Sequence, residues 1–224
     1  MATILRLDTS ARAARSITRH LADAFIDAWI AELPESRVTR RDLGRTPPPH
    51  VSEEWIAAAF TPQNERTSTM RDALAESDRM IDELAAADLV LVAAPLYNYG
   101  LPATLKAWVD QVVRVDRTFT FDLERGDFPI EPVLSGKAMV LLSSRGEFGF
   151  GPGGPREGWN HLNPHMRTIA TRLLGVADSD FHEVASEFQE FRDERHAHSF
   201  KEAERQTRDL ATSLAKRLGT AVVT

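Results

Sequence analysis

Hydroxyl-bearing residues gather in one segment near the amino terminus, just ahead of an apolar pattern with helical spacing. Ser10 is followed, after five intervening residues, by Ser16, Ile17 and Thr18. Side-chain hydroxyls, together with the free N–H groups of a first helical turn, bind anions well. The segment lacks the G-x-G-x-x-G pattern that a dinucleotide pyrophosphate usually demands, so it favours a terminal monophosphate. The alternative is that Ser16 is only a helix cap.

Three arginines accompany these hydroxyls. Arg12 and Arg15 lie inside the segment, and Arg19 follows it. Their guanidinium groups could add charge attraction for the anion, because helix-terminus electrostatics supply only about 0.3–2 kcal/mol. The alternative is that the arginines form a solvated surface. Most of the affinity must therefore come from several hydrogen bonds and from burial of an aromatic body.

Both tyrosines of the chain lie in a second candidate loop, directly after the longest apolar run. Tyr97 and Tyr99 flank Asn98, and Gly100 follows. Two aromatic rings beside an amide and backbone donors suit a flat heteroaromatic ligand with polar edges. The alternative is that the tyrosines pack in the core and that Asn98 and Gly100 form a plain turn.

A third candidate loop runs from Ser144 to Glu147 and contains Arg145 and Gly146. It offers a hydroxyl, a charge and a permissive backbone. This combination is common in turns and is weak evidence when taken alone. It becomes informative because the predicted fold brings the loop beside the other two.

Apolar patterns predict the elements that carry these loops. Short apolar runs predict five strands, at residues 3–8, 38–43, 88–95, 138–142 and 176–184. Apolar residues at helical spacing predict helices over about residues 16–31, 70–84, 102–114, 166–173 and 200–218. Residues 118–121 alternate like a half-exposed strand and predict a small hairpin outside the main sheet.

The alternation of strands and helices predicts an α/β fold, a flavodoxin-like doubly wound five-stranded parallel sheet with helices on both faces. The expected strand order is 2-1-3-4-5. Because we find no internal repeat and no linker, we expect residues 1–224 to form a single domain. In such a sheet the loops after strands one, three and four meet at the carboxyl edge, where ligands bind.

The composition limits the possible functions. The chain has 224 residues, no cysteine and a net charge of −6. The absence of cysteine excludes disulfides, thiolate metal sites and a cysteine nucleophile, so redox chemistry requires a bound cofactor. The negative charge disfavours a nucleic-acid partner. The longest apolar run, residues 89–96, has eight residues and we find no export signal, so we expect a cytoplasmic protein that does not span a membrane.

Three blocks of the sequence resemble the FMN-dependent NADH-azoreductase and NADH:quinone oxidoreductase family, which has a flavodoxin-like fold. The first block is Ser10-x5-Ser16-Ile17-Thr18-Arg19, and the last runs from Ser143 to Gly146. The middle block is the most specific and comprises residues 94–99 (APLYNY) and 102–110 (PATLKAWVD). The segment from Arg114 to Phe121 also looks like the segment that builds the family's dimer.

The resemblance implies a binding site for FMN. Ser10, Ser16, Ile17 and Thr18 would hold the phosphate, Leu96, Tyr97, Asn98 and Tyr99 would line the isoalloxazine ring, and Ser144, Arg145, Gly146 and Glu147 would close its other side. Two residues depart from the family pattern. Glu147 replaces a usual glycine, and Asp116 stands where a glycine commonly precedes the Thr-Phe pair. We expect the Glu147 side chain to turn outward to solvent.

The activity implied by the resemblance is that of an FMN-dependent NADH-azoreductase or NADH:quinone oxidoreductase. FMN would be tightly bound, and two electrons would pass from NADH or NADPH via the flavin to quinones and aromatic azo compounds by a ping-pong mechanism. No catalytic side chain is expected, because the flavin carries the chemistry. The family also implies a homodimer with the pocket at the interface. The alternative function is a flavodoxin-like single-electron carrier or an FMN-binding regulatory protein.

Two other motifs offer competing interpretations. Residues 149–154 match G-x-G-x-x-G after a strand, but Pro152 removes a backbone donor from the motif, so a mobile loop over the substrate pocket is preferred. His161 and His165 have the spacing of a zinc pair without the glutamate of HExxH or an obvious third ligand. We therefore expect no metal site.

Overall fold

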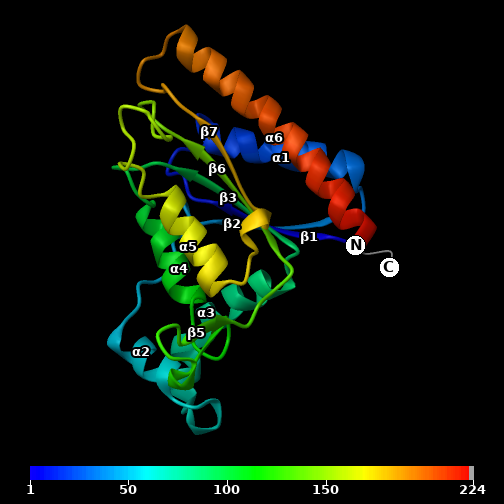
Figure 1. Cartoon of the computed structure of the whole chain (residues 1–224). Coiled ribbons are helices and arrows are strands. Elements are labelled where there is room, and N and C mark those ends of the chain that lie inside the picture. Colours follow the sequence, from blue (N-terminus) through cyan, green and yellow to red (C-terminus); the bar gives the residue numbers. More distant parts are fainter. Residues whose placement is uncertain (222–224) are drawn as a thin grey trace.

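The computed structural model describes residues 1–221, so the last three residues of the predicted range 1–224 lie outside the described residues. The strands of the main sheet are β1 (Thr3–Asp8), β2 (Arg37–Asp42), β3 (Leu89–Pro95), β6 (Ala138–Ser144) and β7 (Phe181–Ser186), and a separate hairpin contains β4 (Phe119–Phe121) and β5 (Ile130–Pro132). The helices are α1 (Ile17–Glu32), α2 (Glu53–Phe60), α3 (Ser68–Ala86), α4 (Ala103–Val112), α5 (Asn163–Leu173) and α6 (Glu194–Ala221) (Figure 1). Within residues 1–221, no helix is both long and apolar enough to cross a membrane.

The main sheet has five parallel strands in the order β2-β1-β3-β6-β7. Counted among themselves along the chain, these strands follow the order 2-1-3-4-5. Every residue of β3 and β6 is buried. A strand covered on both faces requires a continuous apolar run, which β3 shows throughout and β6 shows up to Leu142. β2 lies at an edge of the sheet and has no fully buried residue, which agrees with its polar sequence.

Helices cover both faces of this sheet (Figure 1). On one face, α1 and α6 contribute to a core cluster that includes Phe25 and Leu214. On the other face, α3, α4 and α5 contribute to a second cluster that includes Trp108 and Ile169. Successive strand residues alternate between the two clusters, because side chains of a strand point to opposite faces in turn. This alternation decides which strand-end side chains lie on the α1 face.

Helix α1 is fixed at its start by a cap and along its length by packing. Ser16 has an extended backbone, and its Oγ accepts a hydrogen bond from the Arg19 N–H at 3.4 Å. The predicted helix cap is therefore confirmed. Phe25 and Trp29, one turn apart on the buried face, are both fully buried, and their rings stack at 6.0 Å. Packing of this face holds the first turn of α1 at the carboxyl end of β1.

Three elements differ clearly from the sequence prediction. Helix α6 begins at Glu194, well before the predicted start at about residue 200. The last strand begins at Phe181 instead of residue 176, because Gly175 has a φ of +69° and Asp178–Asp180 form a 3-10 turn before the chain joins β6. Helix α2 was not predicted. It has only eight residues, and an element of about two turns leaves little helical periodicity in a sequence.

Replacement of Phe25 by Ala should lower the free energy of unfolding by about 3–5 kcal/mol, because it leaves a cavity beside Trp29. Urea denaturation followed by far-UV circular dichroism measures this loss. Phe60→Ala is the matched control, since Phe60 is 74% exposed on α2, and it should change the free energy by less than about 0.5 kcal/mol. Equal losses in the two variants would contradict the packing of α1.

Candidate functional site

A cavity of about 230 Å³ lies at the carboxyl edge of the main sheet, between the first turn of α1 and the loops that follow β3 and β6. The predicted site residues that line it are Ser10, Ser16, Ile17, Leu96, Tyr97, Ser144 and Gly146. The predicted residues outside its lining are Thr18, Asn98, Tyr99, Arg145 and Glu147. The structure therefore brings all three predicted loops to one cavity, although some of their side chains point elsewhere.

Hydrogen bonds between the loops hold the walls of this cavity together. The Leu96 N–H donates to the Ser144 carbonyl oxygen at 2.9 Å, which joins the loop after β3 to the end of β6. The Ala11 N–H donates to the Tyr97 hydroxyl at 3.3 Å, which joins the loop after β1 to the loop after β3. Pro95 and Ser144 are register partners on neighbouring strands and both line the cavity. The walls are therefore set by the sheet register.

The first turn of α1 supplies donors at one end of the cavity. Ile17 and Thr18 are the first two residues of the helix, and N–H groups at these positions have no acceptor within a helix. The hydroxyls of Ser16 and Thr18 lie 3.3 Å apart. Thr18 is fully buried and supports Ser16 without lining the cavity. This end of the cavity is suited to an anion.

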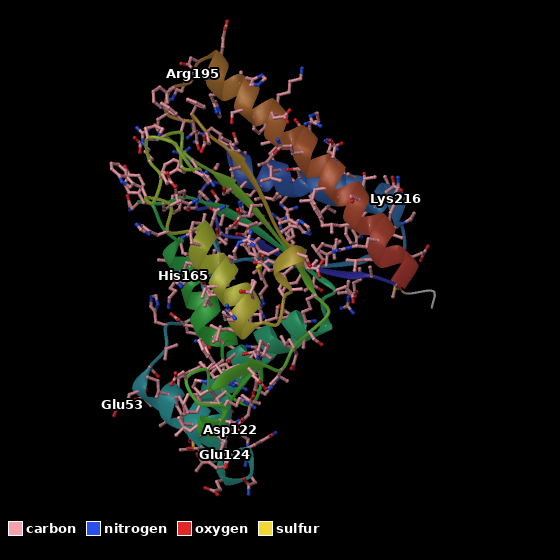
Figure 2. The ribbon with its side chains drawn as sticks, viewed as in Figure 1. Glu53, Asp122, Glu124, His165, Arg195 and Lys216 are labelled. Carbon is pink, nitrogen blue, oxygen red and sulfur yellow. The ribbon has the colours of Figure 1, made fainter. Side chains whose placement is uncertain are left out.

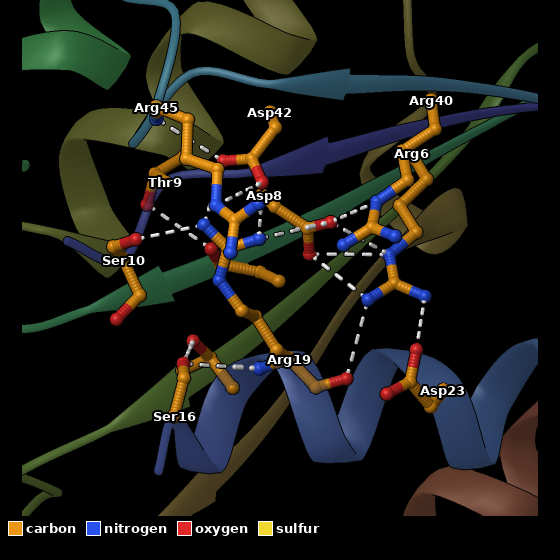
Figure 3. Close-up of polar contacts among 12 residues, drawn as sticks. Arg6, Asp8, Thr9, Ser10, Ser16, Arg19, Asp23, Arg40, Asp42 and Arg45 are labelled. Carbon is orange, nitrogen blue, oxygen red and sulfur yellow. Dashed lines mark hydrogen bonds and ion pairs between the residues drawn. The ribbon is translucent and has the colours of Figure 1, made fainter. Parts of the chain in front are cut away.

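The three arginines near this turn divide into two groups. Arg12 and Arg15 line the cavity and are exposed. Arg19 does not line it, and its guanidinium instead donates to Asp42 and to backbone carbonyl oxygens (Figure 3). Only Arg12 and Arg15 are therefore placed to attract an anion directly.

The Tyr97 to Gly100 segment is a tight turn. Asn98 and Tyr99 have φ values of 47° and 66°, and the Gly100 N–H donates to the Tyr97 carbonyl oxygen at 2.9 Å. Two successive left-handed residues define a type I′ turn, and Asn adopts this conformation more easily than most residues. The alternative prediction, that Asn98 and Gly100 form a turn, is therefore confirmed. The same turn follows Tyr97, which lines the cavity.

Another left-handed residue, Asp116, lies where the sequence departs from the pattern of the family that it resembles. Asp116 has a φ of 62°, and its N–H donates to the Phe119 carbonyl oxygen at 2.8 Å. Glycine adopts this conformation without strain, and Asp tolerates it better than most residues. The departure at Asp116 is therefore compatible with the same backbone.

The Arg145 side chain points away from the cavity. Its Nη1 donates to Glu187 at 2.9 Å and its Nη2 to the Asn163 side chain at 3.3 Å, and the guanidinium lies over the Phe150 ring. Arg145 is 8% exposed. It therefore joins the loop after β6 to the β7–α6 loop and to the start of α5, and only its neighbours Ser144 and Gly146 line the cavity.

The Glu147 side chain is held beside the cavity instead of turning freely to solvent as expected. It accepts a hydrogen bond from the Tyr99 hydroxyl at 2.9 Å and forms an ion pair with Arg156 at 2.5 Å, and its side chain is 34% exposed. The hydrogen bond from Arg156, and then that from Tyr99, lower the pKa of Glu147. The same contact with Glu147 raises the pKa of Tyr99, because the carboxylate stabilises the protonated phenol.

A fourth loop, between β7 and α6, completes the cavity and was not predicted to do so. Gln189 and Glu190 line the cavity. Their N–H groups donate to the carbonyl oxygens of Arg145 and Gly146 at 3.1 and 3.0 Å. Figure 2 shows Arg195 just after this loop, at the amino end of α6. The sequence did not indicate that this loop lines a cavity, because charged residues in a loop usually indicate only a solvated surface.

The residues that match G-x-G-x-x-G form consecutive turns. The Gly154 N–H donates to the Gly151 carbonyl oxygen, and the Arg156 N–H donates to that of Gly149. The next helix, α5, begins only at Asn163. A dinucleotide site of this type requires a helix that starts within the motif, so the local structure argues against that interpretation.

Comparisons with known proteins point to one family. A family model described as having a flavodoxin-like fold matches residues 2–210. The chain is 49% identical over 221 residues to FMN-dependent NADH:quinone oxidoreductase 2 of Colwellia psychrerythraea, covering 96% of this chain and 100% of the relative. It is 41% identical over 214 residues to FMN-dependent NAD(P)H:quinone oxidoreductase 1 of Pseudomonas aeruginosa, covering 95% of this chain and 100% of the relative.

Solved structures show the same fold. The chain is similar to an azoreductase from Bacillus anthracis with a TM-score of 0.84 and 20% identity, covering 95% of this chain and 100% of that chain. It is also similar to an FMN-dependent NADH-azoreductase from Bacillus anthracis in complex with FMN, with a TM-score of 0.82 and 16% identity, covering 96% of this chain and 100% of that chain.

Loss of the Glu147 carboxylate should lower the pKa of Tyr99 toward its ordinary value. Because the chain has only two tyrosines, Tyr97→Phe leaves Tyr99 as the only phenol. In flavin-free protein, tyrosinate absorbance should develop at lower pH in Tyr97→Phe/Glu147→Gln than in Tyr97→Phe. Glu157→Gln is the control, since Glu157 lies in the same loop and accepts the Gly153 N–H instead. Unchanged titration after Glu147→Gln would contradict the contact.

Proposed function

Because the chain belongs to the flavodoxin-like family of FMN-dependent NADH:quinone oxidoreductases, we propose that it passes two electrons from NADH through bound FMN to quinones and aromatic azo compounds. Its relatives are named as FMN-dependent NADH:quinone oxidoreductases, and similar solved structures are azoreductases. The chain is therefore an oxidoreductase that uses FMN and takes electrons from NADH. The acceptor classes, the two-electron transfer and the residues that bind the flavin are the proposed parts.

The observation that carries this proposal is the convergence of a hydroxyl-rich helix start and a tyrosine loop on one cavity. We propose that the hydroxyls of Ser10 and Ser16 and the N–H groups of Ile17 and Thr18 bind the FMN phosphate. Helix-terminus sites favour anions, and a hydroxyl is a donor of the right kind for phosphate oxygens. Arg12 and Arg15 lie in the same wall and add charge attraction. These residues fit a phosphate.

The remaining predicted residues are proposed to contact the isoalloxazine ring. Leu96 and Tyr97 would give it an apolar wall, and the turn at Asn98 and Tyr99 would present backbone and amide groups to its polar edge. Ser144, Arg145, Gly146 and Glu147 would close the other side, with Arg145 contributing its backbone because its side chain is engaged elsewhere. The residues present therefore fit an aromatic body joined to a phosphate.

Bound FMN supplies the redox chemistry, because a flavin can accept a hydride equivalent from NADH and give two electrons to a second substrate. The chain itself binds and orients the reactants. Pro95 and Leu96 exclude water from one wall, and the Tyr99, Glu147 and Arg156 contacts hold the turn beside it in place. Because one cavity would have to serve both substrates in turn, we propose a ping-pong mechanism with no side-chain acid or base.

We also propose that residues 1–224 act as one FMN-binding domain and form a homodimer. Exposed apolar side chains gather around the β4–β5 hairpin, at Phe121, Leu123, Phe128, Ile130 and Val133. A patch of this kind on a globular protein marks an interaction surface. In Figure 1 the hairpin lies at the end of the molecule away from the carboxyl edge of the sheet. It would therefore complete the pocket of the partner subunit and not its own.

The function is tested by anaerobic stopped-flow mixing with NADH. The purified protein should be yellow and release FMN on heating, NADH should bleach the flavin absorbance in a single two-electron phase, and a quinone or an azo dye should restore it. NADPH serves as the comparison donor. A colourless protein that takes up no added FMN would contradict the site, whereas stepwise one-electron reduction without bleaching by NADH would favour the carrier function.

Charge placed on the hairpin should dissociate the dimer. Leu123→Asp and Phe128→Asp introduce a carboxylate into side chains that are 75% and 83% exposed in one subunit, so their burial in a dimer becomes unfavourable. Light scattering coupled to gel filtration should give a dimer mass for the natural chain and a monomer mass for both variants. Ala31→Asp, at an exposed position near the end of α1 and away from the hairpin and the cavity, is the control and should keep the dimer mass. A monomeric natural chain would refute the dimer.

A further inference from the structure

The Arg19 side chain joins two backbone carbonyls of the segment 9–16, which we call the first loop, to the end of β2 (Figure 3). Its Nε donates to the Arg12 carbonyl oxygen at 3.0 Å, and its Nη2 donates to the Ser10 carbonyl oxygen at 2.9 Å. Nη1 and Nη2 also donate to the two carboxylate oxygens of Asp42, each at 2.6 Å. The first loop is therefore anchored to the sheet through one guanidinium.

These contacts leave Arg19 no capacity to bind a ligand directly. A guanidinium has five N–H donors in a fixed planar fork. In Arg19 these donors face the loop carbonyls and Asp42, and the Asp8 carboxylate lies 3.6 Å from Nη1. Arg19 is 7% exposed and does not line the cavity at the α1 terminus. Any effect of Arg19 on a ligand must act through the first loop.

The direction of the loop carbonyls decides the direction of the loop N–H groups. No cis peptide bond occurs within the described residues, and in a trans peptide the N–H points opposite to the carbonyl oxygen. The Ser10 carbonyl faces Arg19, so the Ala11 N–H faces the other side, where it donates to the hydroxyl of the cavity residue Tyr97. Arg19 thus turns a backbone donor of the first loop toward the cavity.

Gly44 lies against the same carbonyl, next to the Arg19 guanidinium. A Cβ atom on residue 44 would lie 2.2 Å from the Ser10 carbonyl oxygen and 3.1 Å from Nη2 of Arg19. The Gly44 N–H donates to the Asp8 carbonyl oxygen at 3.1 Å, which fixes Gly44 against the end of β1. Only glycine allows this close approach of two backbone segments. The Ser10 carbonyl is therefore closely packed against Gly44 while it accepts the Arg19 hydrogen bond.

The pairing of Arg19 with Asp42 is maintained by their mutual electrostatics. The hydrogen bond from Arg19 lowers the pKa of Asp42, and the hydrogen bond to Asp42 raises the pKa of Arg19. Both groups therefore stay charged near neutral pH. Asp42 also accepts the Arg45 N–H at 3.2 Å.

We propose that Arg19, held by Asp42 and packed beside Gly44, is a positioning residue that orients the first loop for the phosphate of the flavin and so makes the protein select FMN over riboflavin. The inference rests on the proposed function. Riboflavin has the same ring and ribityl chain without the phosphate. A residue that orients only the phosphate loop should therefore change FMN affinity and leave riboflavin affinity nearly unchanged.

The test is a fluorescence titration of the full flavin-free chain with FMN and, separately, with riboflavin. In Arg19→Gln the ratio of the dissociation constant for riboflavin to that for FMN should fall by about tenfold or more, which corresponds to the loss of a well-oriented charge-assisted contact. Riboflavin affinity should change by less than about twofold. Gly44→Ala should reduce the ratio in the same direction, because it displaces the Ser10 carbonyl without removing any charge.

Arg41→Gln is the matched control for the loss of an arginine that is paired with carboxylates. Arg41 precedes Asp42 on β2 and makes a comparable multiple contact with two carboxylates, Glu76 at 2.8 Å and Glu83 at 3.0 Å, but does not contact the first loop. Its loss should leave the riboflavin-to-FMN ratio of dissociation constants unchanged. Circular dichroism and thermal unfolding establish that each variant is folded.

The outcomes separate this inference from the proposed function. An unchanged ratio in folded Arg19→Gln, or a loss as large in Arg41→Gln, would overturn the positioning role. If Arg19→Gln does not fold, an unchanged ratio in Gly44→Ala would overturn it. A natural chain that binds neither flavin would contradict the proposed function itself, and one that binds both equally would remove the phosphate site and this inference with it.

Discussion

The Asp8 carboxylate at the end of β1 is fully buried, and the geometry around it depends on keeping that charge paired. Nε of Arg6 donates to both carboxylate oxygens at 3.1 Å, and Nε of Arg40 donates to one of them at 2.6 Å. Arg6 also donates to Asp23 on α1 at 2.6 Å. An unpaired carboxylate would be costly to bury. The cluster therefore joins β1, β2 and α1 where the first loop begins (Figure 3).

The cavity has two chemically different ends because two different elements form it. The start of α1 provides N–H groups, hydroxyls and nearby arginines, while the end of β3 provides Pro95, Leu96 and an aromatic ring. An anionic group joined to an aromatic body is complementary to this division. The chain offers binding and orientation at this place, which suits an enzyme whose redox chemistry belongs to its cofactor.

Much of this arrangement could be predicted, and the reasons are local. The apolar run before Tyr97 required a central buried strand, and the hydroxyl pattern around Ser16 required a capped helix start. Side-chain directions could not be predicted. From the sequence, Arg19 and Arg145 were expected to offer charge to a ligand. In the structure, Arg19 pairs with Asp42, and Arg145 contacts Asn163 and Glu187, all of which are distant in the sequence.

By itself, the sequence determined three of the loops that line the cavity, because apolar periodicity shows where the strands end and parallel strands end at one edge of a sheet. Only the tertiary structure decided which groups enter the cavity. The Glu147 side chain pairs with Arg156 beside the cavity. Gln189 and Glu190 line the cavity from a loop that the sequence did not indicate. Arg19 donates to a backbone carbonyl oxygen instead of entering the cavity. The reason is that a polar side chain follows its nearest partner of opposite charge or hydrogen-bonding character, and those partners are brought close only by folding.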